Sequence, residues 1–94
     1  MVVTGVSIDV DLRAAKARLR GDPRPSYAAR VAELLALRDY YRSSVYARFD
    51  LDSERQVSLA TALHYAKLAR VPRRSRLRQQ IADARRLKLT VEVP

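Results

Sequence analysis

The sequence predicts a mainly α-helical protein, with about four helices in a small bundle and short β-strands at the N- and C-termini. Apolar residues recur at helical spacing through most of the chain, and they alternate every second position only near its two ends. Proline and glycine residues separate the helical stretches from one another. Because 94 residues support one hydrophobic core, we expect residues 1–94 to form a single domain.

Both ends of the chain carry the alternating pattern of a half-buried strand. Val6, Ile8 and Val10 alternate with polar residues, and residues 87–93 alternate between apolar and polar side chains in the same way. Two strands alone are only marginally stable in water. We therefore expect them to pair with each other, or to complete a sheet across a subunit interface.

The first two helices lie in the N-terminal half of the chain. Helical spacing starts after Asp11 and continues to Arg20, where Gly21 predicts the end of the first helix. We expect the second helix to begin after Ser26, whose hydroxyl can cap it, and to run to about Arg48. This helix is the longest predicted element and the expected spine of the fold.

Two further helices follow. Ser53 and Gln56 match a capping box, in which each side chain accepts a hydrogen bond from the backbone amide of the other residue. A third helix is therefore expected to start there. Pro72 predicts its end. Ser75 can cap a fourth helix that ends near Leu87.

The third predicted helix has no formally charged residue over residues 56–66. Apolar side chains cover most of its circumference, so it must be buried on several sides, either inside the monomer or against a second copy. Tyrosines of the second helix lie among arginines, a mixture typical of interfaces and, alternatively, of base-stacking surfaces. We expect a homo-oligomer, with these interface residues: Tyr40, Tyr41, Leu59 and Leu63.

The positive charge is concentrated near the C-terminus. The chain has 19 Lys and Arg against 10 Asp and Glu, a net charge of +9. Residues 67–88 alone hold nine basic side chains and one acidic one, whereas residues 1–66 hold ten and eight. Crowded like charges destabilise a fold, and a polyanion neutralises them. We predict that DNA or RNA is bound through these residues: Lys67, Arg70, Arg73, Arg74, Arg76, Arg78, Gln79, Arg85, Arg86 and Lys88.

Residues 63–87 resemble a helix-turn-helix. Arg76, Gln79 and Gln80 fall in the first turns of its second helix. In that family these turns enter the major groove, where arginine reads guanine and glutamine reads adenine. The resemblance implies DNA binding and a role as a transcriptional regulator.

Other interpretations stay open. One alternative is that the arginines form only a charged face that is exposed to solvent. The protein can instead be an oligomeric structural nucleoprotein that coats or packages nucleic acid, or a non-enzymatic adaptor subunit of a larger complex. The order of one strand and two helices is also similar to ribbon-helix-helix repressors, but Asp9 and Asp11 would then face phosphates, which argues against that mode.

The sequence offers little for catalysis, metal binding or membrane insertion. It has no cysteine and one histidine, His64, so a zinc site lacks ligands. Asp50, Asp52 and Glu54 lack the glycine turn of a calcium loop and are better explained as helix-start residues. The longest charge-free stretch is too short to cross a bilayer. We expect a soluble, cytoplasmic protein without enzymatic activity, metal or cofactor.

Overall fold

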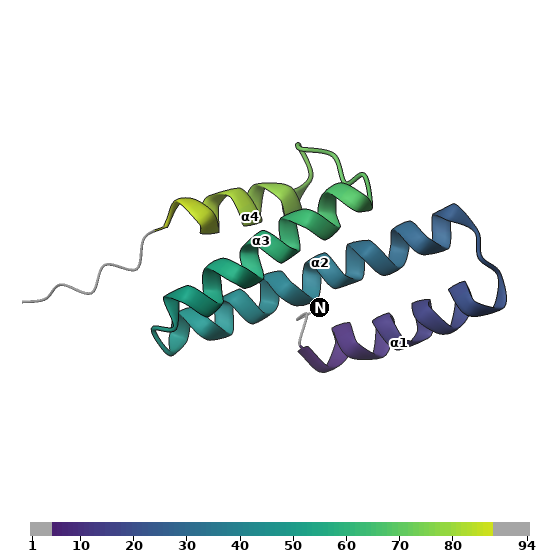
Figure 1. Cartoon of the computed structure of the whole chain (residues 1–94), viewed down its shortest axis with the longest axis horizontal. Helices are drawn as coiled ribbons and strands as arrows, with labels where there is room; N and C mark the ends of the chain where they lie inside the picture. Colours follow the sequence, from purple (N-terminus) through teal and green to yellow (C-terminus); the bar gives the residue numbers. More distant parts are fainter. Residues whose placement is uncertain (1–4, 88–94) are drawn as a thin grey trace, which may run out of the picture.

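The computed structural model describes residues 5–87, which form four helices and, within this range, no strand. α1 spans Gly5–Gly21, α2 spans Pro25–Arg48, α3 spans Asp52–Leu68 and α4 spans Arg76–Arg86. The helices run alternately in opposite directions, with α2 between α1 and α3, and α4 against α3 (Figure 1). The predicted mainly α-helical class and its four helices are confirmed.

The predicted N-terminal strand is wrong, because these residues lie in α1. Ile8 is 2% exposed, whereas Val6 and Val10 are 74% and 59% exposed. Residues two positions apart lie about 200° apart around a helix, so Ile8 points inward and the two valines point outward. Because all three side chains are apolar, the sequence alone reads as the alternation of a strand. Leu12, one turn after Ile8, is also buried and continues the inward face of the helix.

Small side chains bring α2 and α3 together. Ala36 on α2 and Ala62 and Ala66 on α3 are fully buried in one cluster. Ser43 and Ser58, also buried, lie nearer the turn between the two helices. Such short side chains let helix axes approach closely while the interface stays well packed. Residues 56–66 of α3 thus bury one face inside the monomer, while Val57, Ala60 and His64 are exposed on the other face.

α4 packs on this pair through Ile81, which is fully buried in the same cluster as the alanines. Ser75 caps the helix as predicted, since its Oγ accepts a hydrogen bond of 3.3 Å from the amide of Arg78. The helix ends at Arg86, close to the predicted end. The predicted C-terminal strand falls on residues beyond Leu87, outside the described range.

Arg55 fixes the other end of α4. Its side chain is only 5% exposed, and its two Nη atoms donate hydrogen bonds of 2.7 Å to the carbonyl oxygens of Ala84 and Leu87. The same guanidinium donates to Asp52 Oδ1 from Nη2 at 2.9 Å and from Nε at 3.1 Å. A cation at the C-terminus of a helix satisfies carbonyls that have no partner within the helix and complements the helix dipole.

Two predicted helix starts are wrong. α2 starts two residues early, at Pro25 rather than after Ser26, because proline is well suited to the first position of a helix, and no side chain caps it. α3 starts at Asp52, and the predicted capping box of Ser53 and Gln56 does not form. Instead, Gln56 Nε2 donates a hydrogen bond of 2.8 Å to Asp52 Oδ2.

α2 and α3 end in the same kind of turn. After α2, the amides of Asp50 and Leu51 donate back to the carbonyls of Ala47 and Tyr46, at 3.3 and 3.0 Å. This pair of bonds defines the Schellman motif, in which the residue after the cap has a positive φ and is usually glycine. Asp50 occupies that position here, with a φ of 56°.

The turn after α3 repeats this geometry. The amides of Arg70 and Val71 donate to the carbonyls of Lys67 and Ala66, both at 3.0 Å. Arg70 has a φ of 55°, in a region that costs an ordinary L-residue about 1–2 kcal/mol. Each of the two motifs therefore holds a charged side chain where glycine would relieve backbone strain.

Replacing Arg55 is expected to destabilise the protein strongly. Arg55→Met leaves two helix carbonyls without donors and Asp52 without its partner, so the free energy of unfolding should fall by about 3 kcal/mol. Urea denaturation measures this loss. The control, Arg48→Met, changes an exposed arginine and should stay within about 0.5 kcal/mol of the wild type. Equal effects of the two substitutions would show that Arg55 does not hold α4.

Relieving the turn after α3 is expected to stabilise the protein. Arg70→Gly removes the strain of a positive φ and should raise the free energy of unfolding by about 0.5–1 kcal/mol in the same assay. Arg74→Gly, in the same connection but without a positive φ, serves as the control and should not stabilise. A loss of stability in Arg70→Gly would contradict the strain.

Candidate functional site

Five of the predicted nucleic-acid-binding residues line one groove between α3 and α4. The groove has a volume of about 280 Å³, and its floor is formed by apolar side chains that include Leu63 and Ile81. No carboxylate is among its lining residues. The predicted residues that meet there are Lys67, Arg73, Arg78, Gln79 and Arg85. Four positive charges thus share one concave surface, which we call the basic groove.

Local structure explains how the groove forms. Arg78 and Arg85 are seven residues apart on α4 and line the groove together, with the small Ala82 between them. Arg78 Nη1 donates a hydrogen bond of 3.2 Å to the carbonyl of Val71. Gln79 Nε2 donates at 2.9 Å to the carbonyl of Arg73. These two bonds hold the connection between α3 and α4 against the start of α4.

The other predicted residues lie elsewhere. Arg70 lines a hollow between the start of α2 and the end of α3, and Arg76 lines a different hollow with Tyr40 and Tyr41. Arg86 is exposed and pairs with Asp83 at 3.5 Å. Arg74 is exposed in the connection, and Lys88 lies outside the described residues. The predicted basic segment therefore divides among several surfaces.

The predicted interface residues contribute mostly to the monomer. Leu59 is 1% exposed, so its side chain is not accessible to a partner in this fold. Tyr40 and Leu63 are partly buried and pack against the core cluster. Tyr41 is exposed. The sequence pattern could not separate burial inside one chain from burial between chains.

The segment that resembles a helix-turn-helix has a different geometry. The connection between α3 and α4 comprises residues 69–75, longer than the three to four residues typical of that motif. α4 turns back and lies alongside α3, as in an αα-hairpin (Figure 1). Gln79, expected to read adenine, has its amide nitrogen bonded to the carbonyl of Arg73. This arrangement offers no projecting recognition helix.

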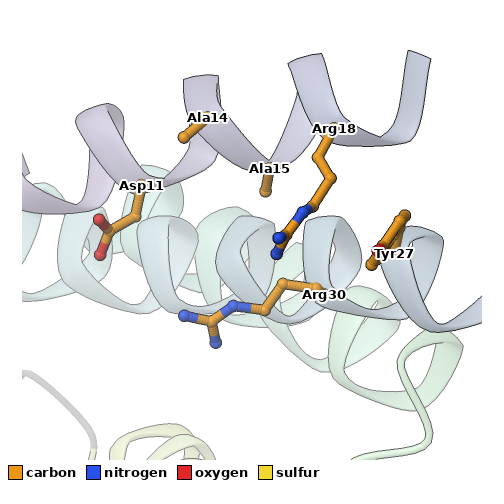
Figure 2. Close-up of a pocket in the computed structure, with 6 residues that line it drawn as sticks. All are labelled: Asp11, Ala14, Ala15, Arg18, Tyr27 and Arg30. Atoms are coloured by element: carbon orange, nitrogen blue, oxygen red, sulfur yellow. The ribbon is translucent and has the colours of Figure 1, made fainter. Parts of the chain in front are cut away.

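The structure also reveals a second basic region, between α1 and α2. Figure 2 shows Arg18 and Arg30 extending into this cleft of about 320 Å³, with Tyr27 at one side and Asp11 at the other. The guanidinium carbon of Arg18 lies 5.1 Å from the centre of the Tyr27 ring, a cation–π contact. Arg30 pairs with Glu33 at 2.9 Å. Unlike the basic groove, this cleft has carboxylates close to its cations.

A signal for this second region is present in the sequence. Residues 12–32 contain six basic side chains and one acidic one. The net charge over residues 1–66 hides these basic side chains, because acidic residues before and after this stretch offset much of its positive charge. A charge count over shorter windows would have found it.

The described residues show no cluster of three or more potential metal ligands. Asp52, one of the acidic residues considered for a cation, is bound to Arg55 and Gln56 instead. His64 is exposed and makes an edge contact with Tyr65, at 5.5 Å between ring centres. None of the helices over residues 5–87 has the length and apolarity to cross a membrane.

Asp39 is a buried carboxylate on α2. Its Oδ2 has no hydrogen-bond partner among residues 5–87, and its Oδ1 lies 4.0 Å from Arg42 Nη1. Burial raises the pKa of Asp39 above its ordinary value of 3.8, against the opposing effect of the charges on Arg38 and Arg42. The side chain is enclosed in the bundle and does not line the basic groove.

Comparisons with known proteins give no family assignment. No protein-family model matches the chain, and neither the curated proteins nor the solved structures include a match to it. The function is therefore argued from the geometry of the site.

Neutralising Asp39 is expected to stabilise the protein at neutral pH. Because its pKa is raised on folding, the folded state holds more protons than the unfolded state between the two pKa values, and stability falls as pH rises through this window. Asp39→Asn should raise the free energy of unfolding at pH 7 by about 1 kcal/mol. This gain in stability should vanish at pH values below 3.8, the ordinary pKa of an aspartate. Thermal unfolding of both proteins across a range of pH measures it. A gain independent of pH would contradict this origin.

Proposed function

We propose that the protein binds nucleic acid through the basic groove, with Lys67, Arg73, Arg78 and Arg85 contacting backbone phosphates. The observation that carries this proposal is the convergence of four cationic side chains on one groove, whose lining among residues 5–87 includes no carboxylate. A solvated charged face normally interleaves acidic residues. Here the charges repel one another, and a polyanion would relieve that repulsion.

The chemistry of the groove favours phosphate recognition. Three of its four cations are arginines, whose planar guanidinium groups form paired hydrogen bonds to phosphate oxygens. Lys67, Arg73 and Arg85 are exposed, so their charges are accessible to a phosphate backbone. Phosphate contacts position a nucleic acid without reading its sequence. Since the amide nitrogen of Gln79 is bonded to the carbonyl of Arg73 and α4 lies alongside α3, the proposed binding is tolerant of sequence.

The salt dependence of binding tests this proposal. If four cations each neutralise one phosphate of duplex DNA, the slope of log K against log salt should be about −3.6. Replacing three of them by glutamine (Lys67, Arg73 and Arg85) should reduce the slope to about −0.9. Arg78 is kept because it also bonds to the Val71 carbonyl. Fluorescence anisotropy with labelled duplex DNA and with single-stranded RNA measures both slopes.

A matched control removes the same amount of charge elsewhere. Substituting Arg13, Lys16 and Arg48 by glutamine also lowers the net charge by three and changes only exposed side chains outside the groove. This control should keep at least most of the wild-type slope. Equal losses in both variants would mean non-specific attraction to a basic protein, and the absence of any nucleic-acid binding by the wild type would refute the proposal.

A further inference from the structure

The two ends of the bundle are separated by the length of α2. The turn between α2 and α3 lies at one end, and the connections from α1 to α2 and from α3 to α4 lie at the other (Figure 1). With 24 residues, α2 holds these ends about 36 Å apart. Features at opposite ends of one molecule therefore cannot contact each other.

An apolar knob, formed by Phe49 and Leu51, lies at the first end. Phe49 is 68% exposed and Leu51 is 42% exposed, although both are large apolar side chains. Asp50 stands between them, and Glu54 is exposed in the first turn of α3. The exposed Arg48 precedes the knob, so its surround carries two exposed carboxylates, those of Asp50 and Glu54, and one exposed cation.

An apolar hollow lies at the other end, between the start of α2 and the end of α3. Its volume is about 630 Å³, and the alanines at 28, 29 and 32 leave much of this space open. Leu68, at the end of α3, lines it and is 59% exposed. Arg70 is the one charged residue in its lining, so the hollow has a positively charged rim.

The charges at both ends sit on strained backbone. Asp50 beside the knob and Arg70 at the hollow are the two residues with positive φ among the described residues that are not glycine. Glycine would be more favourable at each position. Strained backbone of this kind tends to be kept at functional sites, where the side chain compensates for the strain. Here the two retained side chains carry opposite charges.

We infer that the knob of one molecule docks into the hollow of a second copy, so that the chain assembles head to tail. The knob supplies an aromatic side chain, the hollow supplies unfilled apolar space, and Asp50 meets Arg70 at the rim. Because the two surfaces differ, the contact does not close on itself in a pair, and repetition gives a ring or a filament. This inference uses no residue of the basic groove and does not depend on nucleic-acid binding.

The contact is expected to be weak for a single pair. An interface confined to the ends of a narrow bundle is smaller than the roughly 800 Å² per partner of a typical stable complex. Assembly should therefore depend on protein concentration. It should also weaken with added salt, because part of the attraction is between exposed charges.

Sedimentation velocity on nucleic-acid-free protein tests the assembly, over about 1–500 μM. The wild type should grow beyond a dimer as concentration rises. Phe49→Ser, without a knob, and Ala28→Glu, with a blocked hollow, should each stay monomeric. Their equimolar mixture should form a one-to-one dimer and nothing larger, because one functional knob and one functional hollow remain. The control Val6→Ser changes an equally exposed apolar residue and should assemble like the wild type.

The charge pair has its own test. Asp50→Arg and Arg70→Asp should each weaken association at least about tenfold, and the double variant should recover most of it. Arg70→Gly should weaken association while raising stability, which separates docking from folding. Thermal unfolding of each variant checks that it is folded.

Several outcomes would overturn the inference. These are a wild type that stays monomeric at the highest concentration, a mixture of the two single variants that forms no dimer, or a Val6→Ser variant that fails to assemble. The two proposals fail separately, because monomeric Phe49→Ser retains the whole basic groove and can be tested for nucleic-acid binding.

Discussion

The close contact between α2 and α3 is the constraint on which the rest of the structure depends. The fully buried Ala36, Ala62 and Ala66 bring the two helices together. α1 then packs on α2 through Ile8 and Leu12, while α4 packs on α3. This order leaves two separate clefts, one on each side of the central pair, and two distinct ends.

Local chemistry predicted much of the fold. Gly21 is the last residue of α1 as predicted, although its φ is not positive, and Ser75 caps α4 because its hydroxyl satisfies a backbone amide at the helix start. The first strand was predicted wrongly because a two-residue period over five positions fits either a strand or a helix with a buried Ile8. The choice is made by packing against residues 37–44 of α2, which lie 29 or more positions after Ile8 in the sequence.

All five polar residues of the groove were among those predicted to bind nucleic acid, but spacing alone places only two of them together. The spacing of Arg78 and Arg85 on α4 is enough to place them together. Lys67 and Arg73 join them because α4 turns back along α3, a tertiary result that spacing does not contain. The charged residue with positive φ after each central helix was not predictable either, since intrinsic preference favours glycine there.

Because α4 lies at the edge of the bundle, the docking of this helix controls the affinity of the basic groove for a ligand. α4 packs on the α2–α3 pair through Ile81, with most of its contacts to α3, and it supplies two of the four cations of the basic groove, Arg78 and Arg85. If α4 detaches in some molecules, the apparent affinity of a groove ligand equals its intrinsic affinity multiplied by the fraction of molecules in which α4 is docked. Arg55 is not among the groove-lining residues, but it bonds to the C-terminal end of α4 and would therefore set the fraction of molecules in which α4 is docked.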